Sequence, residues 1–471
     1  MDKRNGAVRG SVVFDAIVIA LIPLALNALR LLSPEGSKAP AVGLLLLLLT
    51  KNLLLLPAVS LQHQRRLYQV DMRAKLDLSV VGMLALYLTL MAISIARALG
   101  SIYTLSNTIA NMVLALGGFA AIFTAFLTTD TRSERLLLLR AAPVGIALLV
   151  FANILGYFVG YSAPPIDNES RLNQTLALFG LQVSRAYFPL SFGTNAFGAI
   201  AAVGALSSLL FFPKGRGVSR LFGLVCAGVC LVGLIMVDTR GALVGFILVM
   251  VFAKLNKRFP ALWRLPANLA FLSPVIPFIL YNAFNYINSN ALFGGLVRSG
   301  SQGASLGVGT GRQYIWAAVG REISEPSLIH AIGYGAFGQV SSRVSLGYAW
   351  VFNKLGLTDA SVHNAALQAF LDMGYVGLFV WTALGVLIFR KLGGVQMHSD
   401  EGGWAAALIA ALLLLLVMAQ TEAVVTIYTP ELLFFFSVVV VAASTLTVEA
   451  SRSVADDRLR TRGAWPTLRL R

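Results

Sequence analysis

Long apolar stretches recur along the whole chain and limit what it can fold into. A transmembrane helix needs about 20 mostly apolar residues, and about twelve segments approach that length. Only 12% of the 471 residues are charged, which is about half the proportion in a soluble domain. We therefore expect an all-α, polytopic transmembrane bundle of about 12 helices. The expected spans are 11–31, 41–61, 76–99, 105–127, 142–161, 187–212, 221–237, 242–255, 265–284, 365–389, 404–420 and 432–448.

These spans predict five regions. About five N-terminal helices occupy residues 1–161, and helices six to nine, with Arg185 and Arg240, occupy residues 162–284. A large loop with short helices covers 285–363, three C-terminal helices cover 364–448, and a basic tail covers 449–471. The first apolar stretch is too long for a signal-peptide core and has no small-residue cleavage site, so we interpret it as a retained anchor.

Basic residues predict the orientation of the bundle. Alternate loops are rich in lysine and arginine, as is the C-terminal tail. Cytoplasmic loops of membrane proteins carry this excess, so both termini are expected in the cytoplasm. The net charge of +16 is thus explained by topology, and nucleic acid is not expected as a partner.

The opposite, outer side would hold a loop at 162–184, a turn at 238–241 and a stretch of about eighty residues at 285–363. Within that stretch Tyr314, Ile315, Trp316, Val319 and Ile323 have helical spacing. We predict an amphipathic helix there, capped by Thr310.

Three arginines, Arg185, Arg240 and Arg312, fall on the predicted outer side, against the usual charge bias. A guanidinium group binds phosphate through two parallel hydrogen bonds and stays charged at every relevant pH. Each arginine taken alone could instead extend toward the interface or pair locally, as Arg240 could with Asp238.

His363 and Glu422 are the other candidate residues on this side. His363 stands where the tenth span begins, and a neutral imidazole there could accept a proton from a hydroxyl group. It could equally be a helix-start histidine bonded to backbone. Asp359 is a possible partner by proximity in sequence. Glu422 follows the eleventh span and could be a counter-ion to an arginine or a solvated carboxylate.

Other patterns carry less weight. Cys226 and Cys230 lie in an apolar span and are interpreted as buried and unpaired. The GxGxxG pattern at 333–338 has no strand-helix context, so we expect glycines in tight turns rather than a nucleotide site. The outer loops show no divalent-metal motif. Lys51 is taken as the one charge well inside a span.

Several motifs in residues 185–389 resemble the O-antigen ligase and polysaccharide polymerase family of bacterial inner membranes. They are Arg185 with Asn195 further along the same helix, Thr239-Arg240-Gly241, Gly311-Arg312 through Trp316, Gly333-Tyr334-Gly335, and His363-Asn364 through Gly374 and Gly377. The chain departs from the family pattern in having Thr239 before Arg-Gly and Asp372-Met373 before Gly374.

The resemblance implies a GT-C-type glycosyltransferase that moves a glycan from undecaprenyl diphosphate to an acceptor sugar hydroxyl at the periplasmic face, without metal or cofactor and with inversion. His363, Arg240 and Arg312 would be catalytic, and Arg185, Asn195, Asn364 and Glu422 would bind the diphosphate or glycan. Membrane lipids, flippases and chain-length regulators would be its partners.

Two alternatives remain open at this point. Exopolysaccharide biosynthesis by a polymerase is favoured by the motifs around Arg312 and His363, but an O-antigen ligase of lipopolysaccharide biosynthesis, with lipid A-core as acceptor, would present the same residues. A transporter or lipid flippase would instead place ionisable residues near the midplane and break helices in both halves.

Overall fold

The chain is helical throughout the part that the structure, a computed structural model, describes: residues 8–31, 38–66, 76–163, 172–177, 179–191, 193–212, 217–289, 311–352, 355–398 and 402–463. Within these residues, nine helices are long and apolar enough to cross a membrane, or ten if one bent pair is a single span. No strand occurs in the described ranges beyond two isolated bridges. A polytopic helical bundle is confirmed at this level, while the number of twelve stays a prediction.

Each expected span contains a helix, although some helices are shorter than expected. The first expected span corresponds to α1, which is 16 residues long. The eighth corresponds to α10, which is longer than the expected 242–255 but is not among the nine candidates. The helices are α1 (Gly10–Ala25), α2 (Ala39–Arg66), α3 (Leu78–Arg97), α4 (Leu105–Met112), α5 (Gly118–Leu127), α6 (Arg132–Phe158), α7 (Gln174–Ala177), α8 (Thr194–Phe211), α9 (Val218–Met236), α10 (Arg240–Arg258), α11 (Arg264–Leu272), α12 (Ile276–Ser289), α13 (Arg312–Ser324), α14 (Gly338–Ser341), α15 (Ala365–His398), α16 (Gly402–Ala419) and α17 (Pro430–Gly463).

The sixth span begins later than expected. Helix α8 starts at Thr194 rather than near residue 187. Pro189 has no amide hydrogen to donate into a helix, and Gly193 adopts φ +97° immediately before α8. The expectation that Arg185 and Asn195 share one helix is therefore wrong: Arg185 lies in the non-helical segment that precedes α8.

The ninth expected span is broken. Its two parts, α11 and α12, meet at an angle of 86°. Pro274 lies in the break, where its missing amide hydrogen interrupts the helical bonding pattern. After the bend α12 packs against α13, and the rings of Phe284 and Trp316 stack with centroids 6.0 Å apart. Helix α12 also runs to Ser289, past the loop boundary predicted at 285.

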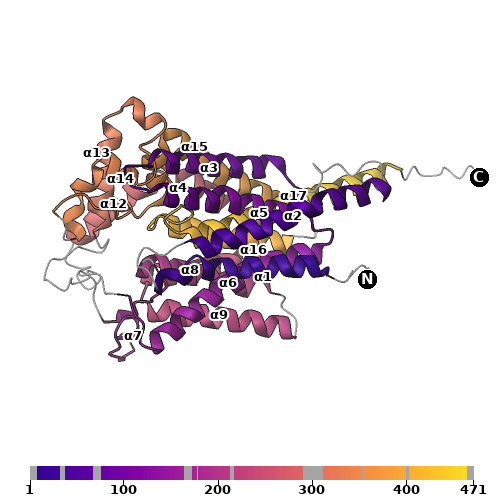
Figure 1. Ribbon diagram of the computed structural model, residues 1–471, viewed down its shortest axis with the longest axis horizontal. Helices are drawn as coiled ribbons and strands as arrows, with labels where there is room; N and C mark the ends of the chain where they lie inside the picture. Colours follow the sequence, from indigo (N-terminus) through magenta and orange to yellow (C-terminus); the bar gives the residue numbers. More distant parts are fainter. Residues whose placement is uncertain are drawn as a thin grey trace, which may run out of the picture.

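The bundle has two chemically different ends. Figure 1 shows the start of α1 and the end of α17 at one end, and α7, α12, α13 and α14 at the other. At the first end, Lys391 Nζ lies 2.9 Å from Asp77 Oδ2, and Arg135 pairs with Glu449. Two of the basic segments expected to be cytoplasmic, those of Arg135 and Lys391, thus lie at the same end. We call this end the inner end and the opposite one the outer end. Its position in the cytoplasm remains a prediction.

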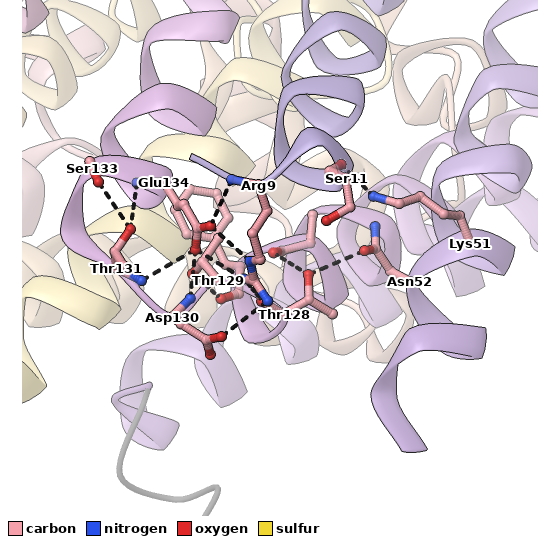
Figure 2. A network of polar contacts seen from close by, with 12 residues as sticks. Arg9, Ser11, Lys51, Asn52, Thr128, Thr129, Asp130, Thr131, Ser133 and Glu134 are labelled. Carbon is pink, nitrogen blue, oxygen red and sulfur yellow. Dashed lines mark hydrogen bonds and ion pairs between the residues drawn. The ribbon is translucent and has the colours of Figure 1, made fainter. Parts of the chain in front are cut away.

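Two acidic residues inside the spans were not identified from the sequence as charges within the membrane. Lys51 is not the one charge within a span, because Asp15 in α1 is fully buried and lies 2.5 Å from Lys51 Nζ. Asp372 in α15 is a further buried carboxylate. Figure 2 shows Lys51 near a second cluster of charged residues, in which Arg9 pairs with Glu134. Paired charges are the usual form in which ionisable groups occur at membrane depth.

Candidate functional site

Residues 420–422, between α16 and α17, contact two distant parts of the chain. Asn364 Nδ2 donates to the carbonyl oxygen of Gln420, 3.1 Å away. Arg312 Nε donates to the carbonyl oxygen of Thr421 at 3.0 Å. The next residue, Glu422, forms an ion pair with the Arg312 guanidinium through Oε1 and lies 3.0 Å from His363 Nδ1 through Oε2. One carboxylate therefore bridges an arginine and a histidine at the outer end of the bundle.

The start of α15 positions His363. Asn364 caps this helix, because its Oδ1 accepts a hydrogen bond from Leu367 N at 2.9 Å. His363 itself has a left-handed conformation with φ +50°, which is uncommon outside glycine. The ring of Phe352 stacks against the imidazole with a centroid distance of 6.1 Å. The partner of His363 is Glu422, not Asp359 as its place in the sequence suggested.

The surroundings of the bridging carboxylate favour its ionised form. Burial alone would raise the pKa of Glu422, but His363 and Arg312 together outweigh burial and lower it. An ionised Glu422 accepts the hydrogen bond from His363, so a neutral imidazole carries its proton on Nδ1. The lone pair is then on Nε2. The His363 side chain remains 21% exposed, so this pair can act as a base oriented by a carboxylate.

Helix α13 positions Arg312 as its first residue. Gly311 precedes it with φ +84°, and a Cβ at that position would lie 2.5 Å from Val351 Cγ1, so glycine is required. The predicted amphipathic helix is confirmed, with Ile315 and Trp316 buried. The N-cap residue is Gly311 rather than the predicted Thr310, which lies outside the described residues.

A second group of predicted residues surrounds the turn between α9 and α10. Arg185 is 2% exposed, and its Nε donates to the carbonyl oxygen of Val237 at 2.7 Å. Arg240 is the first residue of α10 and is exposed. Asp238 accepts hydrogen bonds from the backbone of residues 174 and 175, and no ion pair in the described ranges joins it to Arg240. Asn195 is half-buried near the start of α8.

The two groups lie at the same end of the bundle. A Cβ on Gly245 in α10 would lie 2.4 Å from Met418 Cε in α16, so these helices are in close contact there. From that contact, α10 leads back to Arg240, and α16 leads on to Glu422, whose amide donates to the carbonyl oxygen of Met418. Both directions run toward the outer end. The structure therefore brings Arg312 and His363 into direct contact with Glu422. Asn364 is held beside them by its bond to Gln420, and the residues Arg185, Arg240 and Asn195 lie at the same end.

A third feature, which the sequence analysis did not assign, lies behind His363. Helix α15 is broken at Gly374, which has φ +71°. Gly333 and Gly335, with φ +74° and +90°, form the tight turn that packs against this break, as expected for the GxGxxG pattern. There the amide of Gly335 donates to the carbonyl oxygen of Asp372 at 3.1 Å, and the Asp372 side chain accepts from the Tyr428 hydroxyl at 3.0 Å. The signal that could have found this site was an acidic residue just before a glycine inside an apolar span.

Cys226 and Cys230 are buried and free, as expected. Within the described ranges, no three His, Cys, Asp or Glu side chains cluster in a way that could hold a metal ion. A scan of the chain against models of protein families found no match, and neither did a search of curated proteins. The functional assignment therefore depends on the geometry of the site and on the resemblance of its motifs.

Proposed function

We propose that this chain is a polysaccharide polymerase-type glycosyltransferase that transfers a glycan from a polyprenyl diphosphate carrier to a sugar hydroxyl at the outer face of the membrane. The observation that carries the proposal is the group formed by His363, Glu422 and Arg312. A histidine oriented by an ionised, buried carboxylate is suited to accept a proton from a hydroxyl group. An exposed arginine at the same end of the bundle is suited to an anionic leaving group.

The reaction would be a direct displacement. The acceptor hydroxyl oxygen forms a bond to the anomeric carbon of the donor, while the bond from that carbon to the phosphate oxygen breaks. The diphosphate leaves with the electron pair, and the hydroxyl proton passes to His363 Nε2. Attack from the face opposite the leaving group inverts the configuration. Because the lipid diphosphate is already an activated leaving group, the protein has mainly to orient the reactants and stabilise the developing charge.

The arginines would stabilise that charge in place of a metal ion. Arg240 supports this role because it is exposed at the first residue of α10, where the partial positive charge of a helix N-terminus also favours an anion. Arg185 is buried beside the same turn. Asn195 and Asn364 would orient the glycan or the diphosphate.

Transfer by the purified protein in detergent, between polyprenyl diphosphate-linked glycans, tests the proposal directly. His363→Ala and Arg240→Ala should each lower the rate by about 100-fold or more, the usual contribution of a general base or of one charge-stabilising group. Arg321→Ala is the matched control, because Arg321 is exposed on the same side of the molecule, on α13. Wild-type protein without transfer activity, or a fully active His363→Ala variant, would overturn the assignment.

Deletion of the gene distinguishes polymerase from ligase. Loss of long chains, with single repeats still present, supports polymerisation, whereas loss of attachment to lipid A-core supports ligation. Movement of lipid-linked glycan across vesicles, with no bond formed, would favour the transporter alternative.

A further inference from the structure

The residue before the proposed base is held by two side chains from different elements. Val362 is fully buried, and its amide donates to Gln368 Oε1 at 3.1 Å. Its carbonyl oxygen accepts a hydrogen bond from Trp316 Nε1, also at 3.1 Å. Trp316 belongs to α13 and Gln368 to the first turns of α15. Both peptide groups that flank Val362 are thus fixed, and the second of them is the peptide that joins Val362 to His363.

The orientation of the Gln368 amide is set by its other partners. Its Nε2 donates to Gln339 Oε1 at 2.9 Å and to Asp372 Oδ1 at 2.8 Å, and it lies 3.0 Å from the Tyr428 hydroxyl. These contacts require the NH2 group on that side, because the Gln339 amide oxygen that faces it can only accept. The carbonyl oxygen of Gln368 must then face the amide of Val362. Asp372 and Gln339 therefore determine which atom of Gln368 meets the backbone.

We propose that Gln368 and Trp316 are positioning residues that hold His363 through the backbone of Val362. His363 adopts φ +50°, a conformation that non-glycine residues keep only where the surrounding structure enforces it. The hydrogen bonds fix the peptide planes on both sides of Val362. They therefore hold His363 in this conformation and direct its imidazole toward Glu422. The proposal rests on the proposed function for its catalytic consequence, but the orientation of His363 can be measured without substrate.

Two substitutions remove these hydrogen bonds and keep most of the side-chain volume. Gln368→Met and Trp316→Phe should each lower kcat about 10- to 100-fold with little change in the donor KM, since a misplacement of about 1 Å can cost about 100-fold. Gln396→Met is the control for Gln368, because Gln396 is on the same helix and bonds to Asn256 in α10 at 2.9 Å. Trp381→Phe, in mid-α15, is the control for the loss of ring volume. Both controls should keep kcat within about threefold of wild type.

A double substitution separates positioning from general damage to the fold. With His363→Ala already present, Gln368→Met should lower the remaining rate no further, because it acts through His363. A further drop, similar in size to that in the wild-type background, would overturn the proposal. So would a Gln368→Met enzyme whose kcat matches that of Gln396→Met.

A substrate-free measurement separates this proposal from the proposed function. In ¹⁵N-histidine spectra of the purified protein, with the His363 signals assigned through His363→Ala, wild type should show the Nδ1–H tautomer. Gln368→Met and Trp316→Phe should give a mixture of tautomers, whereas Gln396→Met should not. Unchanged spectra in the first two variants would overturn the positioning role. If the two variants change the spectra but the wild-type protein transfers no glycan, the positioning role stands and the proposed function is refuted.

Discussion

The substitution Glu422→Gln keeps the size of the bridging side chain and removes its charge. The Glu422 side chain is 10% exposed, against 16% for Arg312 and 21% for His363. At an effective dielectric constant of about 20, two unit charges about 4 Å apart interact by about 4 kcal/mol. Loss of one partner of a buried pair costs about 3–5 kcal/mol. Since Arg312 keeps some access to water, we expect a loss of stability near the lower end of that range.

Glu422→Gln should also lower kcat strongly, in addition to its effect on the free energy of unfolding. A glutamine side chain can accept through Oε1 or donate through Nε2, so His363 would no longer be restricted to the Nδ1–H tautomer. An Asp→Asn change at the corresponding position of a serine protease triad lowers kcat by about 10⁴. For Glu422→Gln we expect a fall of about 10²–10⁴, which corresponds to about 2.7–5.4 kcal/mol of activation free energy.

Initial rates of glycan transfer by purified protein measure this effect, and a thermal melt confirms that the variant is folded. Glu325→Gln is the control, because Glu325 is exposed just after α13, and it should retain the wild-type rate within about twofold. A folded Glu422→Gln enzyme with more than about a third of the wild-type rate would refute the role of Glu422. In a His363→Ala background, Glu422→Gln should add little further loss.

Three further predictions concern stability. Gly374→Ala should lower the midpoint of thermal unfolding in detergent by several degrees, because its Cβ would lie 2.5 Å from the Ala331 carbonyl group at φ +71°; an unchanged midpoint would contradict this. Lys51→Met should destabilise more than Lys51→Met with Asp15→Asn, because the single change leaves a buried carboxylate unpaired; a double variant less stable than the single one would contradict it. Because folding lowers the pKa of Glu422, its ionised form stabilises above the unfolded pKa of about 4.3, and that stabilisation is lost as pH falls through the folded value. The difference in melting midpoint between wild type and Glu422→Gln should therefore shrink from pH 7 toward pH 3, and a constant difference would be evidence against it.

Hydropathy was sufficient to predict the helices but not where proline and glycine interrupt them. All the expected spans contain helices, because a run of apolar residues without water has to bond its own backbone. The start of α8 was predicted too early because a hydropathy value does not detect that Pro189 and Gly193 interrupt a helix. For the same reason α11 and α12, which flank Pro274, were predicted as one span. The pairing of Asp15 with Lys51 depends on how α1 meets α2, which no local pattern reveals.

The site was predictable residue by residue but not as a set of contacts. His363 and Arg312 were identified from their position on the outer side, and Glu422 was recognised as a possible counter-ion. Which arginine it would meet could not be deduced, since 110 residues separate Arg312 from Glu422 along the chain. Asp359 was suggested as the partner of His363 because it is near in sequence, whereas tertiary packing brings Glu422 there instead. A role for Gln368 was not predicted, because a glutamine within an apolar helix indicates no function until its hydrogen-bond partners are known.

The charges at the outer end assign different roles to Arg312 and Arg240. The charge of Arg312 is balanced by Glu422, whereas Arg240 is exposed and has no ion pair among the described residues. Under the proposed function, a diphosphate needs a cation whose charge is not already compensated. We therefore expect Arg240 to bind the anion and Arg312 to support Glu422 and His363. Arg240→Lys should then raise the donor KM and its dependence on salt, because lysine keeps the charge but loses the two-bond geometry. Arg312→Lys should mainly lower kcat. If both variants change only KM, both arginines bind the diphosphate, and the division of roles is wrong.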